Sequence, residues 1–203
     1  MSENTAAGME SAPEPSSSST YRLDAAASTF SVQAFAGGLL GGFAHNPTMA
    51  IRDFVGEAHF VPGTFAGASV RLVVRARSLE LVDEVSAKDR AEIERVMRDD
   101  VLEVGAYPEI VFASTSVTVT RAGVDRAKAR IVGDLTLHGV TRKGLWISAL
   151  VRADVEGVRA TGEFTLKQTD YSIRLVSVAG GVIKVKDELK FTFDLLGRPA
   201  PSA

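Results

Sequence analysis

The chain has 203 residues, of which 45% are hydrophobic and 24% charged, and its formal net charge at pH 7 is −2. This composition is ordinary for a globular protein with a sizeable core, and the near balance of charge excludes a long-range attraction to nucleic acid. The sequence has no cysteine, which excludes disulfides, thiolate metal sites and a cysteine nucleophile.

Residues 1–20 are predicted to form a disordered tail, because Pro13, Pro15 and the serine run 16–19 leave little apolar surface to bury. A phosphorylation site or a docking segment is the alternative function for this tail. Neither a secretory signal nor a run of ~18 apolar residues, the length that spans a bilayer, is visible in the sequence. We therefore expect a cytoplasmic protein without a transmembrane segment, whose single folded domain covers residues 21–198.

After the tail, apolar and polar residues alternate, which is the period of a strand with one buried face. The alternation is regular over residues 29–36, 70–77, 128–137, 158–167 and 183–193, and less regular over 49–61, 109–120 and 143–152. Short connections such as Ala122-Gly123 favour antiparallel neighbours. The sequence thus predicts an all-β fold of about eight strands, the number at which a barrel interior can hold one small ligand.

One helix is predicted to interrupt the strands, over residues 86–103. Ser86 and Asp89 have the spacing of an N-terminal capping pair, and Gly105 and Pro108 end the segment. The apolar residues at helical spacing are Ile93, Val96, Met97 and Val101. We expect this single apolar stripe to pack across a barrel end or a sheet face.

The histidines and the glycine-rich segment are the candidates for chemistry. The glycine-rich stretch 37–42 lacks the Gly-Lys-Ser/Thr of a phosphate loop, which favours an apolar connection. His45, His59 and His138 do not have zinc-ligand spacing, so no metal site, cofactor or catalytic residue is assigned. We expect His59 to be structural and His138 to be a turn residue bonded to nearby backbone. His45 is either structural or a polar contact at a pocket mouth.

The inward faces of the predicted strands combine small and large residues. Ala129, Gly133, Ala160 and Gly162 would leave volume inside the barrel, although bulky residues from facing strands could fill it instead. The residues predicted to contact a guest are Phe30, Val32, Phe43, His45, Leu72, Val74, Ile131, Leu135, Gly162, Phe164, Leu166, Phe191 and Phe193.

An ordered set of short motifs resembles the YceI-like family over about residues 21–196. These motifs are Tyr21-Arg22-Leu23-Asp24 with Ser28, Ser78-Leu79, Lys88-Asp89-Arg90, Val101-Leu102-Glu103-Val104, Tyr107-Pro108-Glu109-Ile110-Val111-Phe112 and the stretch from Gly133 to Arg142. The resemblance implies a lipocalin-like, extended antiparallel β-barrel that binds long apolar molecules such as polyisoprenoids or fatty amides. Many family members are periplasmic and some form dimers, so a homodimer is a possible assembly.

The leading functional hypothesis is therefore a non-catalytic carrier or sensor of an isoprenoid-like or fatty-acyl-like ligand inside a barrel. An enzyme that acts on such a ligand, with His45 as acid or base, is the first alternative. A filled barrel that serves as an interaction protein is the second. The expected partner is an apolar small molecule or lipid and not a nucleic acid.

Overall fold

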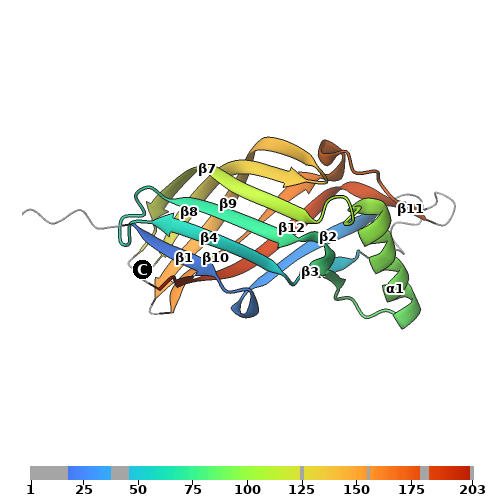
Figure 1. Ribbon diagram of the computed structural model, residues 1–203, viewed down its shortest axis with the longest axis horizontal. Helices are drawn as coiled ribbons and strands as arrows, with labels where there is room; N and C mark the ends of the chain where they lie inside the picture. The colour runs from blue at the N-terminus through green and yellow to red at the C-terminus, as the bar shows by residue number, and fades with distance from the viewer. Residues whose placement is uncertain (1–17, 38–45, 124–125, 155, 179–182, 202–203) are drawn as a thin grey trace, which may run out of the picture.

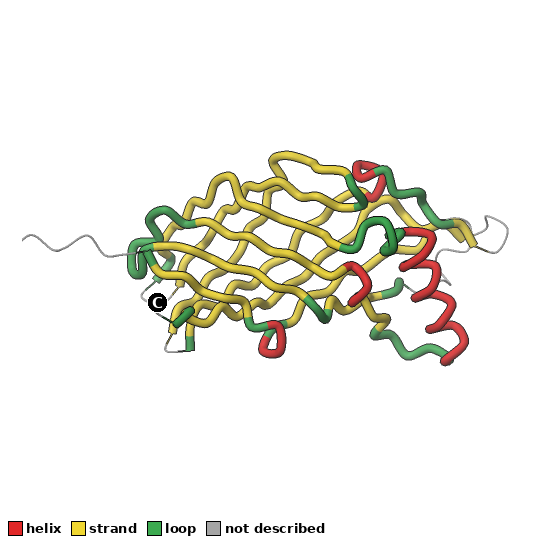
Figure 2. The backbone as a smooth tube through the Cα atoms, in the orientation of Figure 1, coloured by secondary structure: helices red, strands yellow, loops and turns green. Residues whose placement is uncertain are grey.

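The structure is a computed structural model that describes residues 18–37, 46–123, 126–154, 156–178 and 183–201. Its strands wind around a long axis, with the helix α1 (Ala87–Arg95) at one end and the C-terminus at the other (Figure 1). Strands account for most of the described chain and the helical segments are short and peripheral (Figure 2). The predicted all-β fold with one helix is confirmed.

Eight strands form a closed antiparallel barrel. In ring order they are β1 (Ser19–Leu23), β4 (Phe54–Phe60), β5 (Ser69–Arg75), β7 (Glu109–Arg121), β8 (Arg126–Leu137), β9 (Val140–Asp154), β10 (Gly157–Lys167) and β12 (Ile183–Pro199). The ring closes where β1 pairs with β12, with Tyr21 opposite Pro199 and Leu23 opposite Gly197. Closure matters because it removes the unpaired sheet edges that an open sheet would expose.

A second row of strands flares from β12 toward the helix. It consists of β2 (Thr29–Gly37), β3 (Thr48–Ile51) and β6 (Leu79–Leu81), and the short β11 (Ser177–Val178) also pairs with β12. The predicted strand 49–61 is thus broken in two, into β3 and β4. The chain also breaks between β1 and β2 and between β5 and β6, and β1 and β6 lie outside the predicted strands 29–36 and 70–77. The sequence analysis did not predict these breaks. They allow one half of each strand to stay in the ring while the other half bends away.

The first break is built by Asp24, which ends β1 and caps the 3-10 turn η1 (Ala25–Ala27). Its Oδ1 accepts the backbone N–H groups of Ala26 and Ala27, each at 3.1 Å. Arg198 on β12 donates from Nε to Oδ2 at 2.7 Å. The Arg198 hydrogen bond, followed by that from Ala27, holds the pKa of Asp24 below its usual value.

The helical segment follows the predicted boundaries closely. Ser86 caps α1 by accepting the N–H of Asp89, and after Arg95 the helix widens into the π-helical turns of η4 (Val96–Val101). Another 3-10 turn, η3 (Ala76–Ser78), separates β5 from β6. Most of the apolar stripe packs inward as predicted, since Met97 belongs to the buried core and Ile93 and Val101 are partly buried against it.

Two small residues do not leave the space that the sequence analysis expected. A Cβ at Gly162 would lie 2.7 Å from Cζ of Phe193 and would also meet the backbone oxygen of Ser148. Gly133 is covered in the same way by the ring of Phe112. An aromatic ring from a neighbouring strand therefore packs against the backbone of each glycine. The interpretation of these two residues as empty volume was wrong.

The start of the fold differs slightly from the predicted tail. β1 begins at Ser19, so residues 19 and 20 are already paired with β4. Residues 1–17, the glycine-rich stretch 38–42, Phe43 and His45 lie outside the described residues, and the predictions made for them stay predictions.

Candidate functional site: an apolar cavity inside the barrel

An apolar cavity of about 200 Å³ lies inside the barrel. Its wall draws side chains from all eight barrel strands, from the flared strands β2, β3 and β6, and from the end of the helical segment at Val101 and Leu102. Of the described residues that form the wall, only Tyr21 and Gln168 have a polar atom in the side chain. An engineered cavity of ~150 Å³ with a comparable lining stays dry and binds benzene, so this volume is suited to an apolar guest.

The period-two pattern placed most predicted contact residues on this wall. The predicted residues that line the cavity are Phe30, Val32, Leu72, Val74, Ile131, Leu135, Phe164, Leu166, Phe191 and Phe193. Gly162 is not on the wall, because the Phe193 ring lies over it. Phe43 and His45 cannot be placed among the described residues. Whether the wall residues bind a ligand stays a prediction, but the interior is not completely filled by side chains.

Three phenylalanines of the wall, Phe30, Phe164 and Phe191, form an aromatic cluster. Phe164 on β10 and Phe191 on β12 stack with ring centroids 4.8 Å apart and an interplanar angle of 6°. Phe30 on β2 meets Phe191 at 6.3 Å and Phe54 on β4 edge-on at 6.0 Å. Such ring pairs restrict one another, so this part of the wall is a firm surface and not a collapsible one.

Gln168 is the one buried polar residue of the described chain, only 4% exposed, and it was not among the predicted site residues. It opens the 3-10 turn η5 (Gln168–Tyr171) directly after β10. The signal was available, since the alternation that turns Phe164 and Leu166 inward also turns residue 168 inward. Its Nε2 donates to the backbone oxygen of Lys186 at 2.9 Å.

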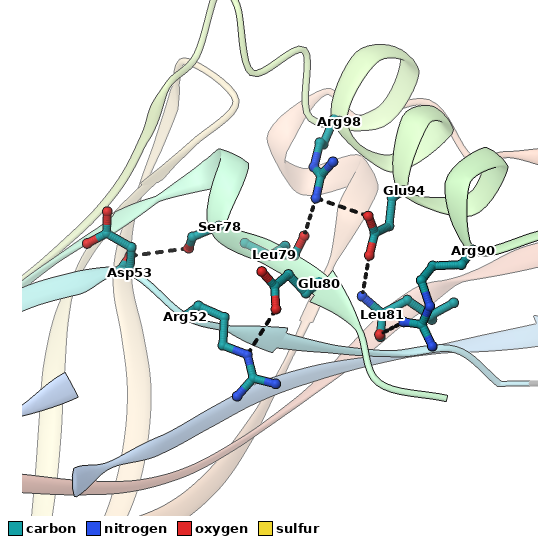
Figure 3. A network of polar contacts seen from close by, with 9 residues as sticks. All are labelled: Arg52, Asp53, Ser78, Leu79, Glu80, Leu81, Arg90, Glu94 and Arg98. Atoms are coloured by element: carbon teal, nitrogen blue, oxygen red, sulfur yellow. Dashed lines mark hydrogen bonds and ion pairs between the residues drawn. The ribbon is translucent and has the colours of Figure 1, made fainter. Parts of the chain in front are cut away.

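The helix is joined to β6 through side chains and not through strand pairing (Figure 3). Among the described strands, β6 pairs only with β3, so its other edge faces α1. Glu94 Oε1 accepts the N–H of Leu81 at 3.1 Å, and Arg98 Nη2 donates to the backbone oxygen of Leu79 at 3.3 Å. Arg98 also pairs with Glu94 at 3.2 Å. We call Glu94 and Arg98, together with Arg90, the helix latch.

Arg90 completes the helix latch nearer the start of α1. One of its nitrogens, Nη1, donates to the backbone oxygen of Leu81, and Nη2 donates to that of Asp83 at 2.8 Å. The latch therefore supplies partners for an edge strand that would otherwise present free backbone groups. Val101 and Leu102, at the end of the same helical segment, line the cavity.

Neither of the two described histidines lines the cavity. His59 Nδ1 is 2.9 Å from Oγ1 of Thr20 and its Nε2 is 3.7 Å from Glu57, which agrees with the structural role expected for it. His138 is a turn residue as predicted, with a left-handed φ of 50°. However, its Nδ1 contacts the backbone oxygen of Tyr171 at 3.3 Å, a residue distant in sequence and not nearby.

His138 joins the end of the helical segment to η5. Its Nε2 lies 3.5 Å from Oε2 of Glu103, and its ring packs on Tyr107 with centroids 4.5 Å apart. Burial raises the pKa of Tyr171, with the Asp170 carboxylate acting in the same direction. The Tyr171 phenol is therefore neutral, as its place in the core requires.

Neither a metal cluster nor a membrane-spanning helix is found within the described ranges. No three His, Asp or Glu side chains of those ranges converge as metal ligands would. None of the helices described is both long and apolar enough to cross a bilayer.

Comparison with known proteins agrees with this architecture. The family model of the YceI-like domain matches residues 21–196. The chain belongs to the YceI-like family. Among curated relatives, a UPF0312 protein of Pseudomonas savastanoi is 33% identical over 119 residues, which are 55% of this chain and 59% of that protein. A UPF0312 protein of Vibrio parahaemolyticus is 34% identical over 90 residues, 44% of this chain and 42% of the relative.

Solved structures share the YceI-like fold. The crystal structure of BcnA from Burkholderia cenocepacia has a TM-score of 0.65 at 19% identity and covers 85% of this chain and 98% of that chain. A polyisoprenoid binding domain from Saccharophagus degradans, implicated in plant cell wall breakdown, has a TM-score of 0.63 at 18% identity and covers 89% and 98%. At these identities the likeness establishes the fold, which is the lipocalin-like barrel that the sequence motifs implied.

Proposed function

We propose that this protein binds one long apolar molecule, of isoprenoid or fatty-acyl type, inside its barrel and carries or senses it without chemical change. The observation that carries the proposal is the continuous apolar wall around a cavity of about 200 Å³. The Saccharophagus degradans relative, described as a polyisoprenoid binding domain, supports the same class of guest.

The energetics favour a guest that is mostly hydrocarbon. Each methylene moved from water into such a wall contributes ~0.8 kcal/mol, whereas one hydrogen bond contributes ~0.5–1.5 kcal/mol net. A wall with two polar side chains among so many apolar ones therefore draws nearly all of its affinity from chain burial. Neither described histidine lines the cavity, so the carrier function is favoured over catalysis by the residues that can be placed.

Solvent extraction of the purified protein followed by mass spectrometry tests the proposal directly. We expect a copurified apolar molecule in the wild type. Ala160 lines the cavity from β10, so Ala160→Phe should displace the guest, because the added phenyl ring would occupy part of the volume that the guest's chain fills. Thr161→Leu, one residue away on the outer face, is the matched control and should retain the guest.

The result that would overturn the proposal is equally specific. A wild-type protein that yields no apolar molecule, and that also fails to bind added prenyl or acyl compounds, is not a carrier of this class. Equal retention of guest by Ala160→Phe and the wild type, with both folded, would place the guest outside the cavity.

A further inference from the structure

We infer that the cavity selects its guest by a head group that donates a hydrogen bond, a hydroxyl or an amide N–H, and that Oε1 of Gln168 accepts it. This inference rests on the proposed function, because it concerns the same cavity. It adds the polar end of the ligand to a site otherwise defined by hydrocarbon.

The position of Gln168 is the first argument. Gln168 is only 4% exposed, yet it belongs to the cavity wall. Around it the wall is apolar, with Leu166 on β10 and Ile173 beyond η5 as its neighbours along the chain. A primary amide in such surroundings is costly unless its polar atoms find partners.

Only half of that amide is satisfied within the described chain. Nε2 donates to the backbone oxygen of Lys186 at 2.9 Å, whereas Oε1 accepts no hydrogen bond from any described residue. Oε1 is not among the fully buried side-chain atoms that lack a hydrogen-bond partner, which within the described chain are Nε of Arg98 and Nε2 of His138. The carbonyl oxygen of Gln168 is therefore the polar atom that this side chain can present to a guest.

The orientation of the amide decides which head group it accepts. Lys186 lies in a bulge of β12, where the register with β2 shifts between Val185 and Leu189, so its carbonyl is available to the side chain. Turning the amide over would point Oε1 at that carbonyl and forfeit the bond. Gln168 is therefore held as an acceptor, which fits an alcohol or an amide N–H and not an ether, an ester or a quinone carbonyl.

The turn that carries Gln168 is fixed at each of its four residues. Asp187 accepts the backbone N–H of Thr169 at 2.9 Å and its hydroxyl at 2.7 Å. Arg142 donates to the backbone oxygen of Asp170, and His138 Nδ1 lies 3.3 Å from that of Tyr171. A fixed acceptor loses little entropy when a guest binds, which is what a selective contact requires.

Tyr21 is the competing polar group, and its place argues against it. It lies on β1, in the barrel end that β1 and β12 close, and its ring stacks on Phe60 at 4.6 Å. A phenol can both donate and accept, so it would not discriminate between the two kinds of head group. Tyr21→Phe keeps the ring stack and is therefore the control for this alternative.

Two isomeric probes separate the possibilities, decan-1-ol as a donor and methyl nonyl ether as an acceptor of the same atomic composition. Their affinities are measured by competition against a fluorescent apolar dye, and the alcohol-to-ether ratio is compared between variants so that differences in hydration cancel. Gln168→Leu should lower this ratio by about 2- to 12-fold, the range of one net hydrogen bond. Tyr21→Phe should leave the ratio unchanged.

Thr169→Val controls for damage to the turn, because it removes one bond to Asp187 and keeps Gln168; it should preserve the ratio. An equal ratio in the wild type and Gln168→Leu, with both probes bound, would overturn the head-group inference and leave the carrier function intact. Binding of neither probe to the wild type would overturn both. If Gln168→Leu does not fold, the side-chain carbonyl carbon of Gln168 in the wild type decides, since its NMR signal should shift with the alcohol and not with the ether.

Discussion

Removal of the Glu94 side chain tests the helix latch. Glu94 is 17% exposed and its partner Arg98 33% exposed, so both are largely shielded from solvent. Glu94→Ala removes both the acceptor of the Leu81 N–H and the ion-pair partner of Arg98. Because β6 and the helix are joined here by side chains, we expect this change to favour local opening of residues 87–102 over unfolding of the barrel.

The magnitude follows from the bonds that are lost. A hydrogen bond to a charged group contributes ~1.5–3 kcal/mol. The contacts of Arg90 with Leu81 and Asp83 survive the substitution, so we expect a value near the lower limit. An opening constant about tenfold larger corresponds to ~1.4 kcal/mol. Glu94→Gln retains an acceptor for the Leu81 N–H and should give a smaller increase.

Hydrogen exchange read by mass spectrometry measures this opening. Peptides from 87–102 should exchange about tenfold faster in Glu94→Ala, while peptides from β8 and β9 serve as the unchanged reference. Glu92→Ala is the matched control, because Glu92 pairs with Arg95 on the exposed side of the same helix and has no contact with β6 among those described. Unchanged exchange in Glu94→Ala, or an equal increase in Glu92→Ala, would refute the latch.

Three further predictions address the fold. Gly162→Ala should destabilise the protein by about 1–3 kcal/mol in chemical denaturation, since its Cβ would meet the Ser148 backbone and Phe193. Gly105→Ala, with open space around the site, should change the stability little. Equal effects of the two substitutions would contradict the packing argument. A chain that starts at Ser19 should keep the full-length thermal midpoint, whereas one that starts at Ala25 should lose stability because β1 closes the ring; the reverse would mean that the tail is part of the fold. Hydrogen bonds from Thr169, first from its backbone and then from its hydroxyl, lower the pKa of Asp187 in the folded protein. The contribution of Asp187 to folding stability is therefore present above its unfolded-state pKa of about 3.8. This contribution is lost as the pH falls through the lower pKa of the folded state. Asp187→Asn should therefore flatten the acid limb of the stability–pH curve, and an unaltered limb would exclude this group.

Much of the fold was predictable because a strand with one buried face has a period that survives in the sequence. The same period placed Phe164, Leu166 and Phe193 on one inner face, where the structure has them. The strand breaks were not predicted, because they depend on contacts between distant segments, such as Arg198 with Asp24. The cytoplasmic location and the homodimer stay predictions.

The volume of the cavity could not be predicted, because side-chain size at one position does not decide what fills the space beside it. Gly133 and Gly162 looked like gaps, yet Phe112 and Phe193 from neighbouring strands cover them. The helix latch was hidden for a different reason. Glu94 and Arg98 have the spacing of an ordinary exposed ion pair on a helix, and only the position of β6 reveals that they also bind strand backbone.

The two ends of the barrel are held by different kinds of bond, which bears on how a guest enters. At one end β1 is tied by backbone pairing to β4 and β12, and Ala200 N donates to the Thr20 oxygen at 2.8 Å. At the other end the helix is held by side chains, which can part without breaking a ladder. Gln168 belongs to this second end, because His138 contacts the backbone oxygen of Tyr171 in its turn and lies 3.5 Å from Glu103 just after the helical segment. A guest that passes the helix with its chain first would leave its head group beside Gln168, so substitutions in the latch should change exchange rates while substitutions in the wall change affinity.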